Sequence, residues 1–278
     1  MHVFLKITLT LSARFTISQT KPNHPTEVTA RIINTEVMID IHTHILYAID
    51  DGAKDIFESE KMCAAAERNG INKIVLTPHI KDCLDFGSFF EMRKEKTETL
   101  KEALNKKDIA VELFTGAEVF LDDDIFYCND LRRYTINNTD YMLCEFQDNF
   151  NSDYKFIKLI NEIKNYEIIP IIAHVEFIRL FYDNIALLRD LKKDLGFKIQ
   201  LNAGSLCKMG RGETNYITAN KIIKEDLADF IATDAHNTRS RNNNILNMIE
   251  QFDLDIENSL LELLLETNPQ KVLDGVMF

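Results

Sequence analysis

The chain lacks the features that mark several common classes of protein. No apolar run approaches the ~20 residues that span a bilayer, which excludes a membrane-embedded protein. The sequence holds no C-x-x-C pair, and its 5 cysteines are an odd number. This usage argues against a disulfide framework and predicts reduced thiols in the cytoplasm. No low-complexity segment or fixed-period repeat interrupts the chain, so we expect an ordinary globular domain.

The sequence also has fewer basic than acidic residues. Lys and Arg number 32 against 44 Asp and Glu, which gives a net charge of −12. Such a field repels phosphate backbones, so we expect no bulk electrostatic binding of nucleic acid. A bound cluster of divalent cations could reverse this sign locally.

The sequence also lacks the cysteine motif of thiolate-dependent phosphatases. None of the five cysteines is followed six positions later by arginine, so the C-x5-R loop of thiolate-dependent phosphatases is missing. Any phosphate ester hydrolysis by this chain must therefore use groups other than a thiolate.

Residues 1–37 differ from the rest of the chain. They hold four basic and two acidic residues, which leaves a net charge of −14 for residues 38–278. Lys6 interrupts the apolar stretch 3–12, and no A-x-A cleavage site follows cleanly, which argues against a signal peptide. We expect either a poorly ordered extension or a start codon assigned upstream of Met38, with the folded domain at 38–278.

From Met38 onwards, short apolar and β-branched runs alternate with longer amphipathic stretches, a pattern that predicts repeated βα units. Seven strands are expected, at residues 38–41, 73–77, 110–115, 141–144, 168–173, 197–201 and 229–233. Seven helices are expected, at 57–69, 89–105, 154–166, 185–195, 217–226, 245–252 and 259–266. Seven βα units predict an α/β fold with a closed or nearly closed barrel of parallel strands, similar to a TIM barrel.

All five histidines of this domain directly follow predicted strands. They are His42, His44, His79, His174 and His236. The carboxyl ends of parallel strands meet on one face of such a fold, so we expect the five imidazoles to converge there.

Carboxylates occupy the same positions. Glu118, Glu145 and Asp234 come at or just after strand ends, and Asp51 follows the first strand within an Asp-Asp-Gly sequence. A single H-x-H or Asp-Gly is weak evidence, because lone histidines at strand ends and Asp-Gly turns are common without a ligand. Together, nine imidazole and carboxylate groups without cysteine suit zinc, manganese or iron, and they are enough for two or three bridged ions.

These residues resemble the motifs of the PHP (polymerase and histidinol phosphatase) superfamily, and most closely those of the bacterial capsule-type, CpsB/CapC-like tyrosine-protein phosphatases. The resemblance covers residues 38–278 and includes the motifs at 38–44, 50–52, 77–79, 116–118, 172–174 and 233–237. It implies a distorted seven-stranded βα barrel that carries a trinuclear metal site.

The resemblance also implies a ligand set. One ion is expected on His42, His44, Glu118 and Asp234, a second on Glu118, Glu145 and His174, and a third on Asp51, His79 and His236. Manganese is the implied metal, with zinc, iron and magnesium as alternatives. Asp51 and Arg241 are the expected catalytic residues.

Two arginines bind phosphate in this family. Arg241 matches one of them, with Arg239 as a nearby competitor. The other normally follows the His-x-Glu sequence directly, where this chain has Phe177. Arg179, two residues further on, is the candidate substitute.

The implied function is a metal-dependent protein-tyrosine phosphatase that acts on a tyrosine autokinase of capsule or exopolysaccharide biosynthesis. A water activated by the metal ions would attack the phosphoryl group in line. A histidinol-phosphatase-like enzyme for small substrates and a weakly active regulatory module are the alternatives; Phe177 favours the module and the intact ligand set argues against it. Whether the chain forms a homo-oligomer is open.

Overall fold

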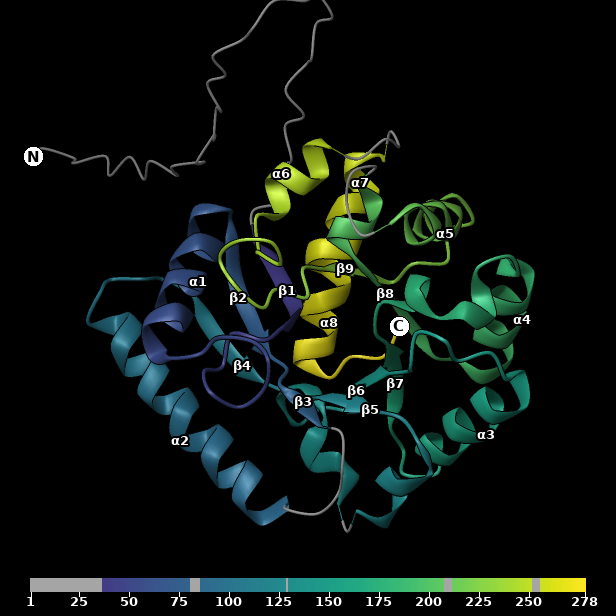
Figure 1. Cartoon of the computed structure of the whole chain (residues 1–278), viewed down its shortest axis with the longest axis horizontal. Helices are drawn as coiled ribbons and strands as arrows, with labels where there is room; N and C mark the ends of the chain where they lie inside the picture. Colours follow the sequence, from purple (N-terminus) through teal and green to yellow (C-terminus); the bar gives the residue numbers. More distant parts are fainter. Residues whose placement is uncertain (1–36, 81–85, 129, 208–211, 252–255) are drawn as a thin grey trace, which may run out of the picture. The chain divides into compact units, whose positions relative to one another are not determined.

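The computed structural model describes residues 37–80, 86–128, 130–207, 212–251 and 256–278 (Figure 1). Residues 1–36 lie outside this range, so the extension at 1–37 stays a prediction. Every pair of strands in the described residues is parallel, which confirms the α/β class. No helix in these residues combines the length and the apolar character that crossing a membrane requires.

The strands form two ladders of hydrogen-bonded neighbours. The first runs in the order β1 (Met38–Thr43), β2 (Ile71–Leu76) and β4 (Glu112–Thr115). The second runs in the order β3 (His79–Ile80), β5 (Glu118–Phe120), β6 (Tyr141–Glu145), β7 (Ile169–Ile172), β8 (Lys198–Asn202) and β9 (Phe230–Ala232). A parallel bridge between Thr43 and Ala235 links the end of β1 to the residues after β9.

The seven expected strands form, and two of them, at 73–77 and 110–115, are followed after a break by short strands, β3 and β5, that were not expected. Pro78 separates β2 from β3, since it has no N–H to donate to a ladder. Gly116 and Ala117 separate β4 from β5 in the neighbouring position, where the Glu118 amide donates to the Pro78 carbonyl at 3.1 Å. The paired breaks place His79 and Glu118 side by side at the start of β3 and β5, which are in register with each other.

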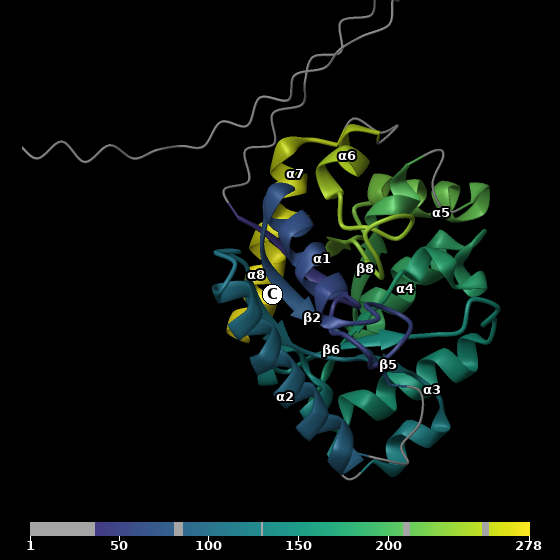
Figure 2. The same ribbon diagram turned by 60° about the vertical axis from the view of Figure 1, so that its left-hand side comes forward.

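All seven expected helices form, and they lie outside the strands (Figures 1 and 2). They are α1 (Ile56–Arg68), α2 (Phe86–Asn105), α3 (Asp153–Lys164), α4 (Ile185–Leu195), α5 (Glu213–Lys224), α6 (Ile245–Glu250) and α7 (Asn258–Glu262). Side chains of Asp55, Ser152 and Asn184 accept backbone hydrogen bonds that begin α1, α3 and α4. A further helix, α8 (Asn268–Asp274), was not expected; Pro269 lies in its first turn, where a proline is tolerated.

The core of the described residues is divided into an inner and an outer cluster. The inner cluster gathers strand residues such as Ile41, Leu143 and Ile171, together with Val272 and Leu273 of α8. The larger outer cluster fills the space between the strands and the surrounding helices. The strands are therefore buried on both faces.

Candidate metal centre

The nine predicted ligands meet at the carboxyl ends of the strands, and Glu118 lies at their centre. Its Oε2 atom is 3.2 Å from His42 Nε2, 3.1 Å from His44 Nε2 and 3.0 Å from His79 Nδ1. Its Oε1 atom is 2.9 Å from His174 Nε2. One fully buried carboxylate thus contacts four imidazoles from three separate segments, as a bridging ligand would.

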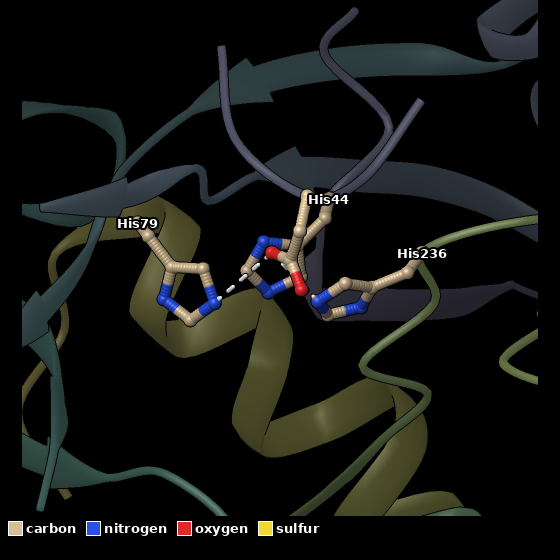
Figure 3. A group of neighbouring side chains, drawn as sticks. His44, His79 and His236 are labelled. Atoms are coloured by element: carbon tan, nitrogen blue, oxygen red, sulfur yellow. Dashed lines mark ion pairs between the residues drawn. The ribbon is translucent and has the colours of Figure 1, made fainter. Parts of the chain in front are cut away.

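His44, His79 and His236 form a second focus, with their rings turned toward one another (Figure 3). Ring centroids lie 3.8 Å apart for His44 and His236 and 4.5 Å apart for His44 and His79. Asp51 Oδ1 is 3.5 Å from Nε2 of both His79 and His236. The Asp51 side chain is 62% exposed, so this focus opens toward solvent.

The two remaining carboxylates flank these groups. Asp234 Oδ1 lies 3.6 Å from His42 Nε2 and 3.5 Å from His44 Nε2. Glu145 lies 3.5 Å from His79 Nδ1 and 3.8 Å from His174 Nε2. Three groups of residues each offer donor atoms that all lie within 4.8 Å of one another. The first group is His44, Asp51, His79 and His236; the second is His42, His44 and Glu118; the third is His79, Glu118 and Glu145.

The backbone around the site is held in an unusual geometry. His174 and Asp234 have φ values of 31° and 52°, in the left-handed region that side-chain-bearing residues seldom adopt. Gly52 packs so closely that a Cβ atom there would lie 2.0 Å from the His44 carbonyl oxygen. Such features persist only where the surrounding structure enforces them, and they cluster at functional sites.

A shell of polar residues orients the imidazoles, and sequence reasoning did not identify it. Gln200 Oε1 lies 3.0 Å from His42 Nδ1 and also accepts the His174 amide at 2.9 Å. Gln200 Nε2 donates to Asn202, which donates to Asp234 Oδ2 at 2.8 Å. Since an amide oxygen only accepts, Gln200 fixes the proton on His42 Nδ1 and leaves Nε2 directed at Glu118.

Asp50 orients His44 in the same way. Its Oδ2 atom lies 2.7 Å from His44 Nδ1 and accepts the His79 amide at 3.0 Å, and its Oδ1 atom accepts the Gly52 amide at 2.9 Å. Although partial burial would raise it, the pKa of Asp50 is lowered to about 2 by the hydrogen bond and charge of His44. The sequence motif pointed to Asp51 as the ligand and left its neighbour Asp50 without a role.

Charges in the site are strongly coupled. Burial would raise the pKa of Glu118, but the charge of His42, the hydrogen bond from His174 and the nearby imidazoles of His42 and His44 hold it well below its usual range. Burial would lower the pKa of His174, but Glu118 raises it to about 9. The pKa of His236 falls to about 3, because burial and the charge of His44 both oppose its protonation. Protons on selected imidazoles therefore balance the carboxylates in the absence of other cations.

An adjoining cavity of about 470 Å³ is lined by ligand residues and by Asp148, Phe177, Ser240 and Arg241. Arg241 Nη2 lies 2.9 Å from both carboxylate oxygens of Asp234, and its Nη1 lies 3.7 Å from Asp51. Arg179 and Arg239 are exposed and do not line this cavity. Of the three predicted phosphate-binding arginines, the structure thus brings Arg241 alone to the site.

Two buried carboxyl groups lie behind the ligands. Asp40 accepts hydrogen bonds from the amide and the hydroxyl of Thr233, and burial raises its pKa to about 6. Glu176 is fully buried and accepts the Asn202 amide at 3.0 Å. Both residues tie neighbouring strand ends together.

Sequence comparison identifies relatives of this chain. Residues 38–274 match the family described as capsular polysaccharide synthesis, CpsB/CapC. Tyrosine-protein phosphatase YwqE of Bacillus subtilis (strain 168) is 35% identical over 211 residues, which cover 74% of this chain and 80% of that protein. A putative tyrosine-protein phosphatase CapC of Staphylococcus aureus is 34% identical, over 73% of this chain and 79% of that protein.

A solved structure is similar over most of its length. It comes from a crystallographic study of YwqE from Bacillus subtilis and CpsB from Streptococcus pneumoniae, described as unique metal-dependent tyrosine phosphatases. The match has a TM-score of 0.71 and 30% identity, and it covers 87% of this chain and 96% of that one. The family match, the shared fold and the resemblance of the strand-end motifs agree. The chain belongs to the CpsB/CapC family of capsular polysaccharide synthesis.

Proposed function

We propose that this protein is a metal-dependent phosphomonoester hydrolase that acts on phosphotyrosine in proteins. The observation that carries the proposal is the convergence of five imidazoles and four carboxylates beside one cavity, with Glu118 in contact with four of the histidines. The named relatives are tyrosine phosphatases, and one solved relative is described as metal-dependent, which supports the same reaction here.

The donor atoms fit divalent cations. His79 Nδ1, Glu118 Oε2 and His236 Nε2 are buried and make no hydrogen bond within the described residues. Buried polar atoms are rarely left in this state, so a ligand is the natural partner for them. We assign one ion to His42, His44, Glu118 and Asp234, a second to Glu118, Glu145 and His174, and a third to Asp51, His79 and His236. Imidazole and carboxylate together suit manganese, zinc or iron, and we favour manganese.

When bound, these ions would supply Lewis-acid chemistry, by polarising the phosphoryl group and acidifying water. The protein's own contribution is to place charges around the reacting group. The Nε atom of Arg241 is buried without a hydrogen-bond partner, so it can donate to an incoming phosphoryl oxygen. Asp51 lies 3.5 Å from both His79 and His236, where it would complete the ligands of the third ion. A phenolate leaving group has a pKa near 10, so it needs less help from a general acid than an alkoxide does.

The protein needs no thiolate for this reaction. Cys63, Cys128, Cys144 and Cys207 are buried, and none of them lines the cavity. Burial raises the pKa of Cys63 to about 12, which keeps that thiol protonated at neutral pH. We therefore propose direct attack on phosphorus without a covalent enzyme intermediate.

We further propose that the two ladders form the distorted seven-stranded barrel of the PHP superfamily. In this count β2 and β3 are one strand, and β4 and β5 are another. The bridge between Thr43 and Ala235 supports this arrangement, because it links the first strand to the last. The proposed partner is a tyrosine autokinase of capsule or exopolysaccharide biosynthesis. Cytoplasmic location and homo-oligomer formation stay predictions.

A chelator titration tests the proposed reaction. Hydrolysis of an aryl phosphate should disappear as divalent ions are removed and should return when manganese is added back. The His42→Ala variant should not recover under the same conditions. Full activity after complete removal of metal would overturn the proposal.

A further inference from the structure

Phe177 contributes the one apolar side chain among the described residues that line the cavity. Its neighbours in the wall are charged groups, imidazoles and a serine. The side chain is half-buried, and it belongs to neither the inner nor the outer apolar cluster. An aromatic ring in a charged cavity therefore has to be explained by something other than core packing.

The ring is held in a fixed place beside the ligands. It lies against the imidazole of His174, with ring centroids 5.1 Å apart and planes inclined by 27°. The Phe177 amide donates to the His174 carbonyl at 2.8 Å, and the Phe177 carbonyl accepts from the Tyr182 hydroxyl at 2.8 Å. Since His174 Nε2 contacts Glu118, the ring is one residue away from the centre of the site.

We propose that Phe177 determines substrate specificity by packing against the aromatic ring of an aryl phosphate. The inference rests on the proposed phosphatase function and adds the residue that selects the leaving group. Aromatic rings attract one another in offset or edge-to-face pairs with centroids 4.5–7 Å apart, beyond the effect of buried area alone. An alkyl phosphate, such as phosphoserine, gains no such contact in a cavity whose other walls are polar.

The same ring stands where the family resemblance predicts an arginine that binds phosphate. A phenyl group cannot hold a phosphoryl oxygen, so recognition of the phosphate falls to Arg241 and to the metal ions. Recognition of the rest of the substrate falls to Phe177. We therefore expect this chain to prefer aryl over alkyl phosphate esters.

The test compares the manganese-loaded wild type with Phe177→Leu and Phe177→Tyr. Leucine keeps an apolar side chain against His174 and removes the aromatic ring, whereas tyrosine keeps the ring. The substrates are two peptides of identical sequence that carry phosphotyrosine or phosphoserine. The Phe177→Leu variant should lose about 2- to 12-fold in kcat/KM for the phosphotyrosine peptide and change little for phosphoserine. The Phe177→Tyr variant should keep the wild-type preference.

Binding of phenylphosphonate and methylphosphonate, measured by calorimetry, gives a second readout that does not depend on turnover. The wild type should favour the phenyl compound, and the Phe177→Leu variant should lose that preference. If the wild type binds with this preference but hydrolyses neither peptide, the inference holds and the proposed function fails. Equal losses on both peptides with reduced metal content would show that the ring merely supports His174. An unchanged aryl preference in the Phe177→Leu variant would also overturn the inference.

Discussion

The same strands pass through two very different environments within a few residues. In the inner cluster, Ile41, Leu143 and Ile171 are fully buried among other apolar groups. A step further along, His42, Glu145 and His174 enter a site where charges crowd together and several buried atoms have no hydrogen-bond partner. The apolar side chains of the inner cluster are satisfied by packing against one another, whereas the site has buried polar atoms that find no partner among the described residues. The contrast separates residues that stabilise the fold from residues that serve a ligand.

The largest expected effect is at the centre of the site. Glu118→Gln removes the charge that contacts four imidazoles and should lower kcat for an aryl phosphate by at least about 10³-fold, because several kcal/mol of Lewis-acid stabilisation depend on the bridge. Elemental analysis should show fewer metal ions per chain. Glu112→Gln is the matched control, since Glu112 is an exposed glutamate in β4. Normal turnover by the Glu118→Gln variant would remove Glu118 from the mechanism.

The inner cluster should respond in the opposite way. Leu143→Ala leaves a cavity among fully buried side chains and should lower the free energy of unfolding by about 2–5 kcal/mol. Metal content and kcat per folded molecule should stay as in the wild type. Denaturant unfolding of the metal-free protein, combined with elemental analysis, measures both quantities. A selective loss of metal in this variant would mean that the two regions are not separable.

The shell behind the ligands should give an intermediate effect. Gln200→Leu removes the acceptor of His42 Nδ1 and of the His174 amide, and it should weaken metal binding by about 10- to 100-fold. Competition with a calibrated chelator measures the change. Gln251→Leu, at an exposed glutamine after α6, serves as the control. Equal affinity in both variants would show that Gln200 only fills space.

The smallest effect should be that of pH. The pKa of His174 is raised to about 9 and that of His44 stands well above its usual value, so both carry protons at pH 7 in the metal-free protein. Metal ions bind neutral imidazole, and binding must therefore release these protons. Apparent affinity should rise as pH increases from 7 toward 9. Calorimetry in two buffers of different ionisation enthalpy counts the protons, and a count of zero would contradict this charge balance.

Much of the site was predictable because the chemistry follows the strands. Each domain histidine comes at a strand end, and the parallel arrangement brings strand ends together, so the gathering of the nine candidate ligands was predicted from sequence. The supporting shell was not predictable, because Gln200 and Asn202 lie within an ordinary strand pattern and only their contacts distinguish them. Nearness in sequence also misled: Arg179 follows the His174 motif closely, but its side chain points to solvent.

The fold departed from expectation where single residues override a pattern. Pro78 and Gly116 follow the expected strands at 73–77 and 110–115, and the short strands β3 and β5 that come after them were not expected. The break has a use, because it sets His79 and Glu118 opposite each other. Helix α8 was not expected either, and it continues directly from a π-helical turn at Leu263–Thr267.

Direct counting of metal ions tests the central claim. Protein purified with manganese and freed of loosely bound ions should hold two or three equivalents per chain by elemental analysis. The Glu118→Gln variant should hold fewer, and its folding should be intact by circular dichroism. A wild-type chain that retains no divalent ion, while remaining folded and active on an aryl phosphate, would contradict the account.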